Sequence, residues 1–422
     1  MKTLTSHQHI FLSAVLISLL LGPQSVFSQT KKKVLFLGNS YTAYNNLPQL
    51  VADVALSAGD TVVFSSNTPG GYTLQGHSTD ATSLSLISAG DWDHVVLQEQ
   101  SQRPSFPLNQ VQSNVFPYAR ALDSIAHALN PCVQTVFYMT WGRKNGDASN
   151  CAVWPPVCTY AGMDSLLRLR YMQMAQDNDA MVSPVGAIWR HIRNTYPGIE
   201  LYQTDESHPS LAGSYAAACA FYTVFFRKNP GLIATDAGLD PLVASQIRQA
   251  ATAVAFDSLS NWFVDAYDAT SAFTFSNNGL STTFQNNSSF ADYHNWDFGD
   301  GYTSTQVNPT HVYATPGTYL VTLQNSNCFS SDTDTAWVSV FNTGLSEWSS
   351  SVSIFPNPVT DELNIVGVNG KEVAIQFIDG RMAMVSPIVD EKVNVQELAN
   401  GAYVLRVYTG ETIRSYRFFK LK

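Results

Sequence analysis

The sequence contains few charged residues: they make up 13% of its 422 residues, against roughly 25% in an average soluble protein. It also lacks an excess of basic residues, because 23 Lys and Arg stand against 33 Asp and Glu and leave a formal net charge of -10. A nucleic-acid-binding face needs positive charge, so this composition argues against nucleic acid as a partner. Hydrophobic residues reach 45%, enough for a sizeable core, and the length predicts two to four domains.

Cysteine is scarce as well, with five in the whole chain. No two of them have the C-x-x-C spacing of a zinc site, which argues against cysteine-based metal binding. Cys151 and Cys158 lie close together in a stretch rich in Pro, Trp and Gly, and we predict a local disulfide there. Cys132, Cys219 and Cys328 lie in strand-like or helix-like contexts, where we expect buried thiols.

Long hydrophobic runs are absent except near the N-terminus. Lys2 precedes an apolar stretch, Ile10 to Leu21, and Val26-Phe27-Ser28 offers a cleavage site before Gln29. This pattern predicts a signal peptide over residues 1–28. A membrane anchor is the alternative, but a span needs about 20 apolar residues and this run is shorter. We expect an exported mature chain with no transmembrane segment, either soluble or attached to the cell surface.

Residues 29–267 alternate between short apolar runs and longer segments with helical spacing. This alternation predicts a parallel sheet with helices on both sides. The expected strands are 33–38, 61–66, 94–98 and 133–141, and the expected helices are 47–59, 111–129 and 163–176. In such sheets the ligand site lies at the C-terminal ends of the strands.

Ser40 directly follows the first predicted strand, in "FLGNSYT". A serine hydroxyl is a poor nucleophile unless a base takes its proton, and a carboxylate usually orients that base. Asp205 and His208 occur three residues apart in "DESHP", before an Ala-rich segment. Alone, Ser40 reads more simply as a helix cap, but together the three residues predict a catalytic triad.

These two stretches resemble the first and last blocks of the SGNH or GDSL-type hydrolases. The resemblance implies a three-layer α/β/α fold, with Ser40 as nucleophile and Asp205 and His208 completing the triad. It also implies an oxyanion hole made by the Ser40 N–H, a glycine N–H and an amide side chain. We assign the glycine as Gly71, with Gly70 close behind.

The sequence departs from the family at the amide side chain of the oxyanion hole. The family has an asparagine after the third strand, where this sequence reads "VVLQEQSQRP" and contains no asparagine. Aligning strand ends places Gln100 at that position, and Gln98 is the alternative. Asn39 stands where the family has aspartate. We expect Asn39 and Gln98 to line the substrate site together with Trp141, which could stack on a sugar ring or equally be part of the core.

Helical periodicity disappears after about residue 267, and turn-rich β segments follow. "WDFGDG" and "NPTHVYATPGTYLVTL" in residues 268–342 resemble a polycystic-kidney-disease (PKD) repeat, which implies a β-sandwich with Trp296 and Phe298 facing inward.

Residues 343–351 read as a linker. "IFPNPVTDELNI", "IQFIDGRM" and the basic C-terminus, within 352–422, resemble the C-terminal sorting domain of the type IX secretion system. The resemblance implies export through that machinery and two small all-β sandwich domains behind the α/β domain.

The combined prediction is a secreted serine esterase that hydrolyses carboxylic esters, most simply acetyl esters on a polysaccharide. No metal or organic cofactor is implied. Two alternatives remain open. One is a non-catalytic surface protein that binds carbohydrate through a retired hydrolase domain, and the other is an esterase of the same fold that acts on lipid or aryl esters.

Overall fold

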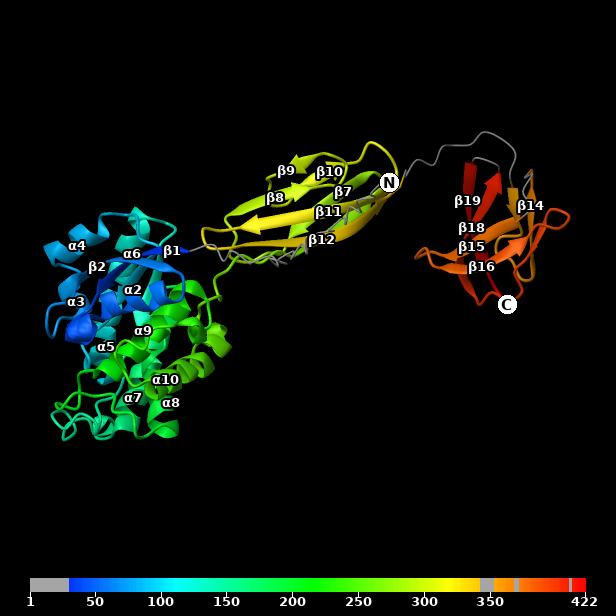
Figure 1. Cartoon of the computed structure of the whole chain (residues 1–422). Coiled ribbons are helices and arrows are strands. Elements are labelled where there is room, and N and C mark those ends of the chain that lie inside the picture. The colour runs from blue at the N-terminus through cyan, green and yellow to red at the C-terminus, as the bar shows by residue number, and fades with distance from the viewer. Residues whose placement is uncertain (1–29, 342–352, 368–371, 410–411) are drawn as a thin grey trace, which may run out of the picture. The chain divides into compact units, whose positions relative to one another are not determined.

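The computed structural model describes residues 30–341, 353–367, 372–409 and 412–422, so the predicted signal peptide and linker lie outside the described residues. The described chain forms two compact units. The first extends to residue 339 without 278–280 and 314–316, which group with 340–422 in the second. In Figure 1 the helices gather in the blue to green part of the chain, and the yellow to red part consists of strands. No helix among the described residues is both long and apolar enough to cross a membrane.

A five-stranded parallel sheet forms the centre of the α/β region, with strand order β2-β1-β3-β4-β5. Its strands are Lys31–Leu37 (β1), Thr61–Asn67 (β2), His94–Leu97 (β3), Gln134–Tyr138 (β4) and Met181–Ser183 (β5). The parallel sheet that the sequence predicted is therefore confirmed. The sequence did not reveal β5, because three residues are too few to produce a recognisable apolar run.

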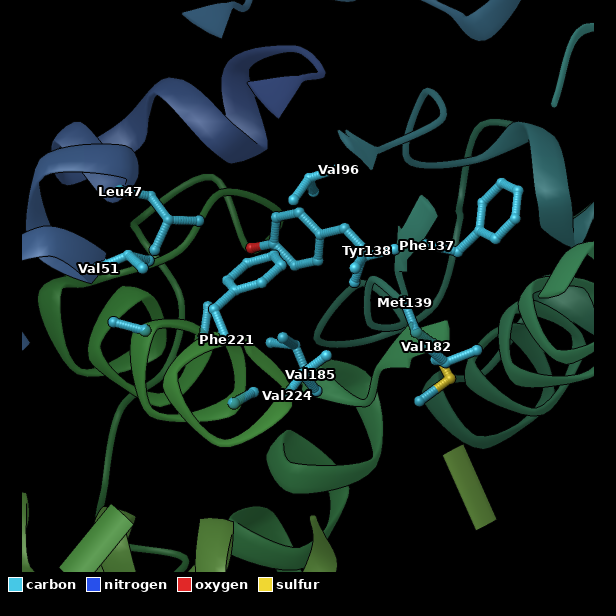
Figure 2. Close-up of a cluster of buried hydrophobic side chains, with 14 of the residues drawn as sticks. Leu47, Val51, Val96, Phe137, Tyr138, Met139, Val182, Val185, Phe221 and Val224 are labelled. Atoms are coloured by element: carbon cyan, nitrogen blue, oxygen red, sulfur yellow. The ribbon is translucent and has the colours of Figure 1, made fainter. Parts of the chain in front are cut away.

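Helices pack on this sheet, and consecutive strand residues meet different partners because their side chains alternate between faces. Figure 2 shows Tyr138 and Phe137 of β4 projecting in opposite directions, with Tyr138 directed toward Phe221. The Tyr138 and Phe221 rings meet edge to face at 5.0 Å. Phe221 belongs to α9 (Leu211–Phe226), whose residues from 212 onward are all buried. A helix that is apolar all round is stable only in such a buried place.

The other helices are α1 (Ser40–Ala43), α2 (Leu47–Ser57), α3 (Leu74–His77), α4 (Ala81–Ile87), α5 (Leu108–Asn114), α6 (Phe116–Leu129), α7 (Tyr160–Asp177), α8 (Val185–Thr195) and α10 (Pro241–Val254), with 3-10 turns η1 (Tyr44–Asn46), η2 (Arg103–Ser105), η3 (Pro155–Val157), η4 (Pro230–Leu232) and η5 (Phe256–Trp262). The single helix predicted over 111–129 is wrong, since the chain breaks at Val115 into α5 and α6. Pro117 explains the break: its ring lacks an N–H and clashes with the preceding helical turn.

The first all-β region contains β6 (Phe273–Asn278), β7 (Ser281–Asn286), β8 (Tyr293–Asp297), β9 (Thr303–Ser304), β10 (Thr310–Val312), β11 (Gly317–Ser326) and β12 (Ser331–Val340). They form two antiparallel sheets, β10-β7-β6 and β12-β11-β8-β9. Trp296 and Phe298 are buried as predicted. The Trp296 ring of one sheet packs against Phe273 and Phe284 of the other, so these aromatic residues close the sandwich core.

The second all-β region is also a pair of antiparallel sheets, β13-β14-β17 and β16-β15-β18-β19. Its strands are β13 (Ser353–Phe355), β14 (Glu362–Val366), β15 (Glu372–Phe377), β16 (Met382–Pro387), β17 (Lys392–Asn394), β18 (Gly401–Thr409) and β19 (Thr412–Lys420). Leu363 and Ile365 of β14 are buried in one core with Leu405 of β18. This shared core joins the two sheets into a second sandwich.

The cysteines confirm one prediction and correct another. Cys151 and Cys158 form the expected local disulfide, and Cys219 is the expected buried free thiol on α9. Cys132 and Cys328 are not free thiols, because they are bonded to each other across 196 residues of sequence. Cys132 precedes β4 and Cys328 lies between β11 and β12, and local sequence carries no signal for a pairing so distant.

Candidate active site

Ser40 lies at the C-terminal end of β1, as the first residue of α1. Gly38 makes the sharp exit from the strand possible: a Cβ atom there would lie 2.4 Å from the Thr42 hydroxyl oxygen and 2.7 Å from Gln98 Oε1. Asn39 then caps α1, since its side-chain oxygen accepts the Tyr41 N–H at 3.1 Å. The helix is therefore capped by Asn39, and the Ser40 hydroxyl is left for another partner.

That partner is His208. Its Nε2 atom lies 2.8 Å from Ser40 Oγ, and its Nδ1 atom contacts Asp205 Oδ2. The other carboxylate oxygen, Oδ1, accepts the backbone N–H groups of His208 at 3.0 Å and Ser207 at 3.1 Å. The three residues that the sequence singled out thus form one hydrogen-bonded chain, in the order that general-base activation of a serine requires.

The environment of Asp205 keeps its carboxyl group charged. Partial burial acts to raise the pKa of Asp205, but hydrogen bonds from the His208 side chain and from the His208 and Ser207 backbone outweigh it. The net result is an Asp205 pKa below its ordinary value. An ionised carboxylate at Nδ1 holds the imidazole proton there, which leaves Nε2 free to accept a proton.

A stack of aromatic rings supports the loop that carries Asp205 and His208. Trp141 stacks on Trp189 at 3.7 Å and on Tyr41 at 4.8 Å. The Trp141 indole N–H donates to the Ser207 carbonyl at 3.1 Å, and the Tyr41 and Ser207 hydroxyl oxygens are 2.6 Å apart. Trp141 is 0% exposed, so it has no face to offer a sugar ring. We correct its predicted role to support of the triad loop.

Asn39 has a structural role instead of the predicted substrate contact. It is buried, and its side-chain NH₂ donates to the Tyr72 carbonyl at 2.9 Å and, more weakly, to the Glu99 carbonyl at 3.4 Å. These bonds join the segments that follow β1, β2 and β3. Asn39 therefore holds together three loops at the edge of the sheet where Ser40 lies.

Gln98 is also internal, which excludes both of its predicted roles. It is buried, its Oε1 accepts from the Asn39 N–H and the Thr42 hydroxyl, each at 2.9 Å, and its NH₂ donates to the Glu99 carbonyl. The Gln100 amide is held within its own loop, where Nε2 donates to Gln102 Oε1 at 3.1 Å. The role of Gln100 in an oxyanion hole stays a prediction.

The backbone of Gly71 remains a candidate for that hole. Gly71 lies in the exposed segment between β2 and α3 with a φ of +69°, a conformation that favours glycine. The bond from Asn39 to the neighbouring Tyr72 carbonyl ties this segment to the Ser40 turn. Within residues 30–341, the N–H groups of Ser40 and Gly71 donate to no protein acceptor.

Replacing Asn39 with Asp should weaken both the fold and the site. A carboxylate would lose the two N–H bonds and face two carbonyl oxygens, so we expect a loss of about 1–3 kcal/mol in the free energy of unfolding. Loosening the Gly71 loop should lower any Ser40-dependent rate by about 10²-fold. Urea denaturation and ester hydrolysis measure the two effects. Asn109→Asp, on an exposed surface of α5, is the matched control, and equal behaviour of both variants would contradict the role of Asn39.

Glu99 is a buried acid that the sequence analysis did not single out. Burial raises its pKa to about 7, although the Gln100 N–H, the Arg103 charge and the Leu74 N–H each act to lower it. Its two oxygens accept from Gln100 N at 2.6 Å and from Leu74 N at 3.3 Å. Glu99 thus connects the start of α3 to the loop after β3.

This raised pKa predicts a pH dependence of stability. Because the folded-state pKa of Glu99 exceeds the ordinary value of 4.5, its contribution is fully present below that value and is lost as the pH rises toward 7. Across this window the wild type should lose about 3 kcal/mol relative to Glu99→Gln. Urea denaturation at pH 4.5 and pH 7 measures the difference, with Glu206→Gln at an exposed position as control. If the free energy of unfolding changed equally with pH in the wild type and in Glu99→Gln, the prediction would be contradicted.

The long segment after β4 borders the triad loop. The Lys144 N–H donates to the Glu206 carbonyl at 2.9 Å, and the buried carboxylate of Asp147 accepts from the Gln102 side chain at 2.7 Å. The Cys151–Cys158 disulfide closes this segment. Within the described residues, no group of three or more His, Cys, Asp or Glu side chains has the arrangement of a metal site.

Two residues of the site, Tyr44 and Asn45, carried only weak signals in the sequence. Tyr44 follows Ser40 by one helical turn, and its ring stacks on the His208 imidazole at 4.3 Å. Asn45 donates to the Pro209 and Ser210 carbonyls, each at 3.1 Å, and so fixes the residues after His208. The four-residue spacing from Ser40 could have suggested that Tyr44 lies near the site, but no local pattern indicates that it stacks on His208.

Two known family models match the two C-terminal regions of the chain. Residues 267–340 match the model of the PKD domain, and residues 353–419 match that of the secretion system C-terminal sorting domain. The sorting domain indicates a secreted or cell-surface protein and implies an interaction with the type IX secretion machinery. Collagenase ColQ1 of Bacillus cereus (strain Q1) is 41% identical over 76 residues, which are 18% of this chain and 7% of the collagenase. The chain thus matches less than a tenth of the length of this curated relative.

Solved structures similar to the chain include a DUF4886 family protein from Bacteroides uniformis ATCC 8492. It is 16% identical, and the match covers 55% of this chain and 95% of that one with a TM-score of 0.46. A protein from Slackia heliotrinireducens, described as a candidate SGNH hydrolase, is 26% identical and covers 46% of this chain and 97% of its own with a TM-score of 0.39. The assignment of chemistry to this chain therefore depends on the geometry of its own residues.

Proposed function

We propose that the chain is a secreted serine esterase of the SGNH type, in which Ser40 is the nucleophile, His208 the general base and then acid, and Asp205 the residue that orients His208. The proposal is carried by the chain of contacts from Ser40 Oγ through the His208 imidazole to Asp205, with 2.8 Å between Oγ and Nε2. The proposed domains are residues 29–267 for the esterase, 268–342 and 352–422 for the β-sandwiches, and 343–351 for the linker.

In the proposed reaction, Ser40 Oγ bonds to the ester carbonyl carbon while its proton passes to His208 Nε2. The carbonyl electron pair moves onto the oxygen, which the N–H groups of Ser40 and Gly71 would stabilise. Collapse of this intermediate expels the alcohol, which takes the proton from Nε2, and leaves an acyl group on Ser40. A water molecule, deprotonated by His208, then attacks the acyl group and releases the acid and free Ser40.

Gln100 is the proposed third donor to the oxyanion. One hydrogen of the Gln100 NH₂ is donated to Gln102 Oε1 at 3.1 Å, and the second hydrogen is the one that Gln100 would donate to the oxyanion. The glutamine at the family's asparagine position is the feature that favours the second candidate function, a carbohydrate-binding protein that does not turn over its ligand. Affinity of the folded chain for an acetylated glycan without release of acetate would support that second candidate.

We propose an acetyl ester on a polysaccharide as the substrate. Support comes from secretion, which the sorting domain indicates, and from the attached PKD domain, by analogy with other exported enzymes of modular construction. The alternative of a lipid ester requires a pocket for long acyl chains, and that of an aryl ester requires a pocket for an aromatic alcohol.

A chain-length series of p-nitrophenyl esters tests both the activity and the acyl group. We expect the full chain to hydrolyse the acetate best and to lose activity steeply beyond short acyl chains, because a small acyl pocket rejects additional methylene groups. Acetate release from acetylated xylan, with deacetylated xylan as control, tests the glycan. A preference for long acyl chains would contradict the acetylesterase assignment.

A further inference from the structure

Tyr44 lies against the imidazole ring of His208. Its ring centroid is 4.3 Å from that of His208, and the ring planes differ by 20°, so the two rings stack face to face. Tyr44 is four residues after Ser40, in the turn η1 that follows α1, which brings it to the same side of the chain as the nucleophile. It is 37% exposed, and its hydroxyl has no hydrogen-bond partner among the described residues.

The other neighbours of the His208 imidazole contact its two nitrogen atoms or meet the ring at a steep angle, and Tyr44 is the group that stacks on the ring face. Asp205 occupies Nδ1 and Ser40 occupies Nε2. Tyr41 meets the ring at 5.3 Å with an angle of 69° between planes, and Tyr41 is tied to Ser207. Arg143, a nearby cation that acts on Tyr41, is paired with Asp147.

An aromatic face at this distance distinguishes between the two charge states of the imidazole. A cation within about 6 Å of a tyrosine ring centroid is attracted by the negative face of the ring, whereas a neutral ring is held mainly by packing. In acyl transfer His208 is neutral before Ser40 attacks and positively charged after it takes the Oγ proton. The stack is therefore stronger in the state that follows proton transfer, which is the requirement for lowering a barrier.

We propose that Tyr44 is a positioning residue that stabilises the protonated His208 formed when Ser40 attacks the ester. The inference rests on the proposed function for its catalytic consequence, but the contact itself can be tested without a substrate. The alternative is that Tyr44 only packs against the ring. Packing would be equally retained by an aliphatic side chain of similar size, and this difference makes the two explanations separable.

The test is a pH titration of the His208 ring signals by NMR, in the full chain with labelled histidine and with His208→Gln to identify the signal. In Tyr44→Leu the titration midpoint should move to lower pH by about 0.4–0.7 units, because a cation–π contact at an exposed position contributes about 0.5–1 kcal/mol. Tyr44→Phe keeps the ring face and should titrate like the wild type. An unchanged or higher midpoint in folded Tyr44→Leu would overturn the proposal.

Tyr44→Trp covers the case in which the leucine variant does not fold. Tryptophan has the strongest cation–π interaction of the aromatic residues, so its midpoint should lie at or above that of the wild type, and a lower midpoint would overturn the proposal. Circular dichroism establishes folding for each variant. Tyr44→Leu should lower the titration midpoint, whereas Tyr44→Trp should keep or raise it. General disruption of the loop would not produce this difference between the two variants.

Kinetics then connect the contact to turnover. For p-nitrophenyl acetate, Tyr44→Leu should lower kcat by about 2–5-fold and move the acidic limb of the kcat/KM profile to lower pH, while Tyr44→Phe should restore both. If the titrations follow expectation but no ester is hydrolysed, the proposed function fails and the contact stands. If Ser40-dependent hydrolysis occurs and the titration midpoints do not move, the inference about Tyr44 fails and the function stands.

Discussion

Ser40→Ala should reduce kcat for p-nitrophenyl acetate by about 10⁴-fold or more, with the fold unchanged. The hydroxyl oxygen is the atom that forms the acyl-enzyme bond in the proposed mechanism, and alanine offers no replacement. We expect the stability to be retained, because Asn39, and not Ser40, caps α1. The measurement is initial-rate hydrolysis by the purified full chain of wild type and variant, with circular dichroism and urea denaturation to compare their folding.

Ser85→Ala is the matched control for this substitution. Ser85 is an exposed serine on α4, so its loss should leave the rate unchanged. Equal rates for wild type and folded Ser40→Ala would end the serine-esterase proposal. In that case Ser40 would simply be the first residue of a capped helix, and glycan binding would become the next property to measure.

Asp205→Asn is expected to have the second largest effect, a fall of about 10³–10⁴-fold in kcat at neutral pH. Asparagine can still accept the backbone N–H groups of Ser207 and His208 through its oxygen, so the loop should keep its shape. Its NH₂ group, however, would face His208 Nδ1 and favour the tautomer whose proton is on Nε2. In that tautomer Nε2 cannot accept the proton of Ser40.

The pKa of Asp205 defines where this effect should appear. Since hydrogen bonds lower the Asp205 pKa below its ordinary value, the carboxylate remains charged as the pH falls through the weakly acidic range. Protonation of Asp205 should therefore not limit wild-type activity in that range. Rates of wild type and Asp205→Asn measured from pH 5 to 9 test this, with pH values chosen to span the ordinary range of an imidazole.

Glu206→Gln provides the control for loss of charge in the same loop. The Glu206 carboxylate accepts from the Asn145 side chain at 2.8 Å, and glutamine can still accept this bond. Its rate should stay within about twofold of the wild type, since surface substitutions away from a structural feature have small effects. Comparable losses in Glu206→Gln and Asp205→Asn would show that the loop responds to charge in general, and would contradict a specific role for Asp205.

The parts of this protein that depend on local pattern were predictable from the sequence. Buried strands appear as apolar runs, and a parallel sheet brings their C-terminal ends to one edge, so Ser40 after β1 was expected near the chemistry. The three-residue spacing of Asp205 and His208 was enough to place both groups in one turn, where the structure has them in contact. The inward alternation of Trp296 and Phe298 followed in the same way from the two-residue period of a strand.

Other features were decided only when distant segments met. Trp141 and Gln98 both lie at the ends of predicted strands, and for that reason the sequence predicted that both would contact the substrate. The fold instead buries Trp141 in an aromatic stack and fills the hydrogen-bonding capacity of Gln98 with Asn39 and Thr42. Whether such a side chain faces a ligand or the core depends on which loops pack over it, and their sequences are far away along the chain.

The sequence by itself predicted the α/β order, the residues of the proposed triad and the secretion signal in the C-terminal domain, because each depends on residues that are close together or at strand ends. The tertiary structure decided the pairing of Cys132 with Cys328, the role of Asn39 and the stacking of Tyr44 on His208. The physical reason is the same in each case. Contacts between residues separated by 33 to 196 positions depend on chain packing, and no local period or motif encodes them.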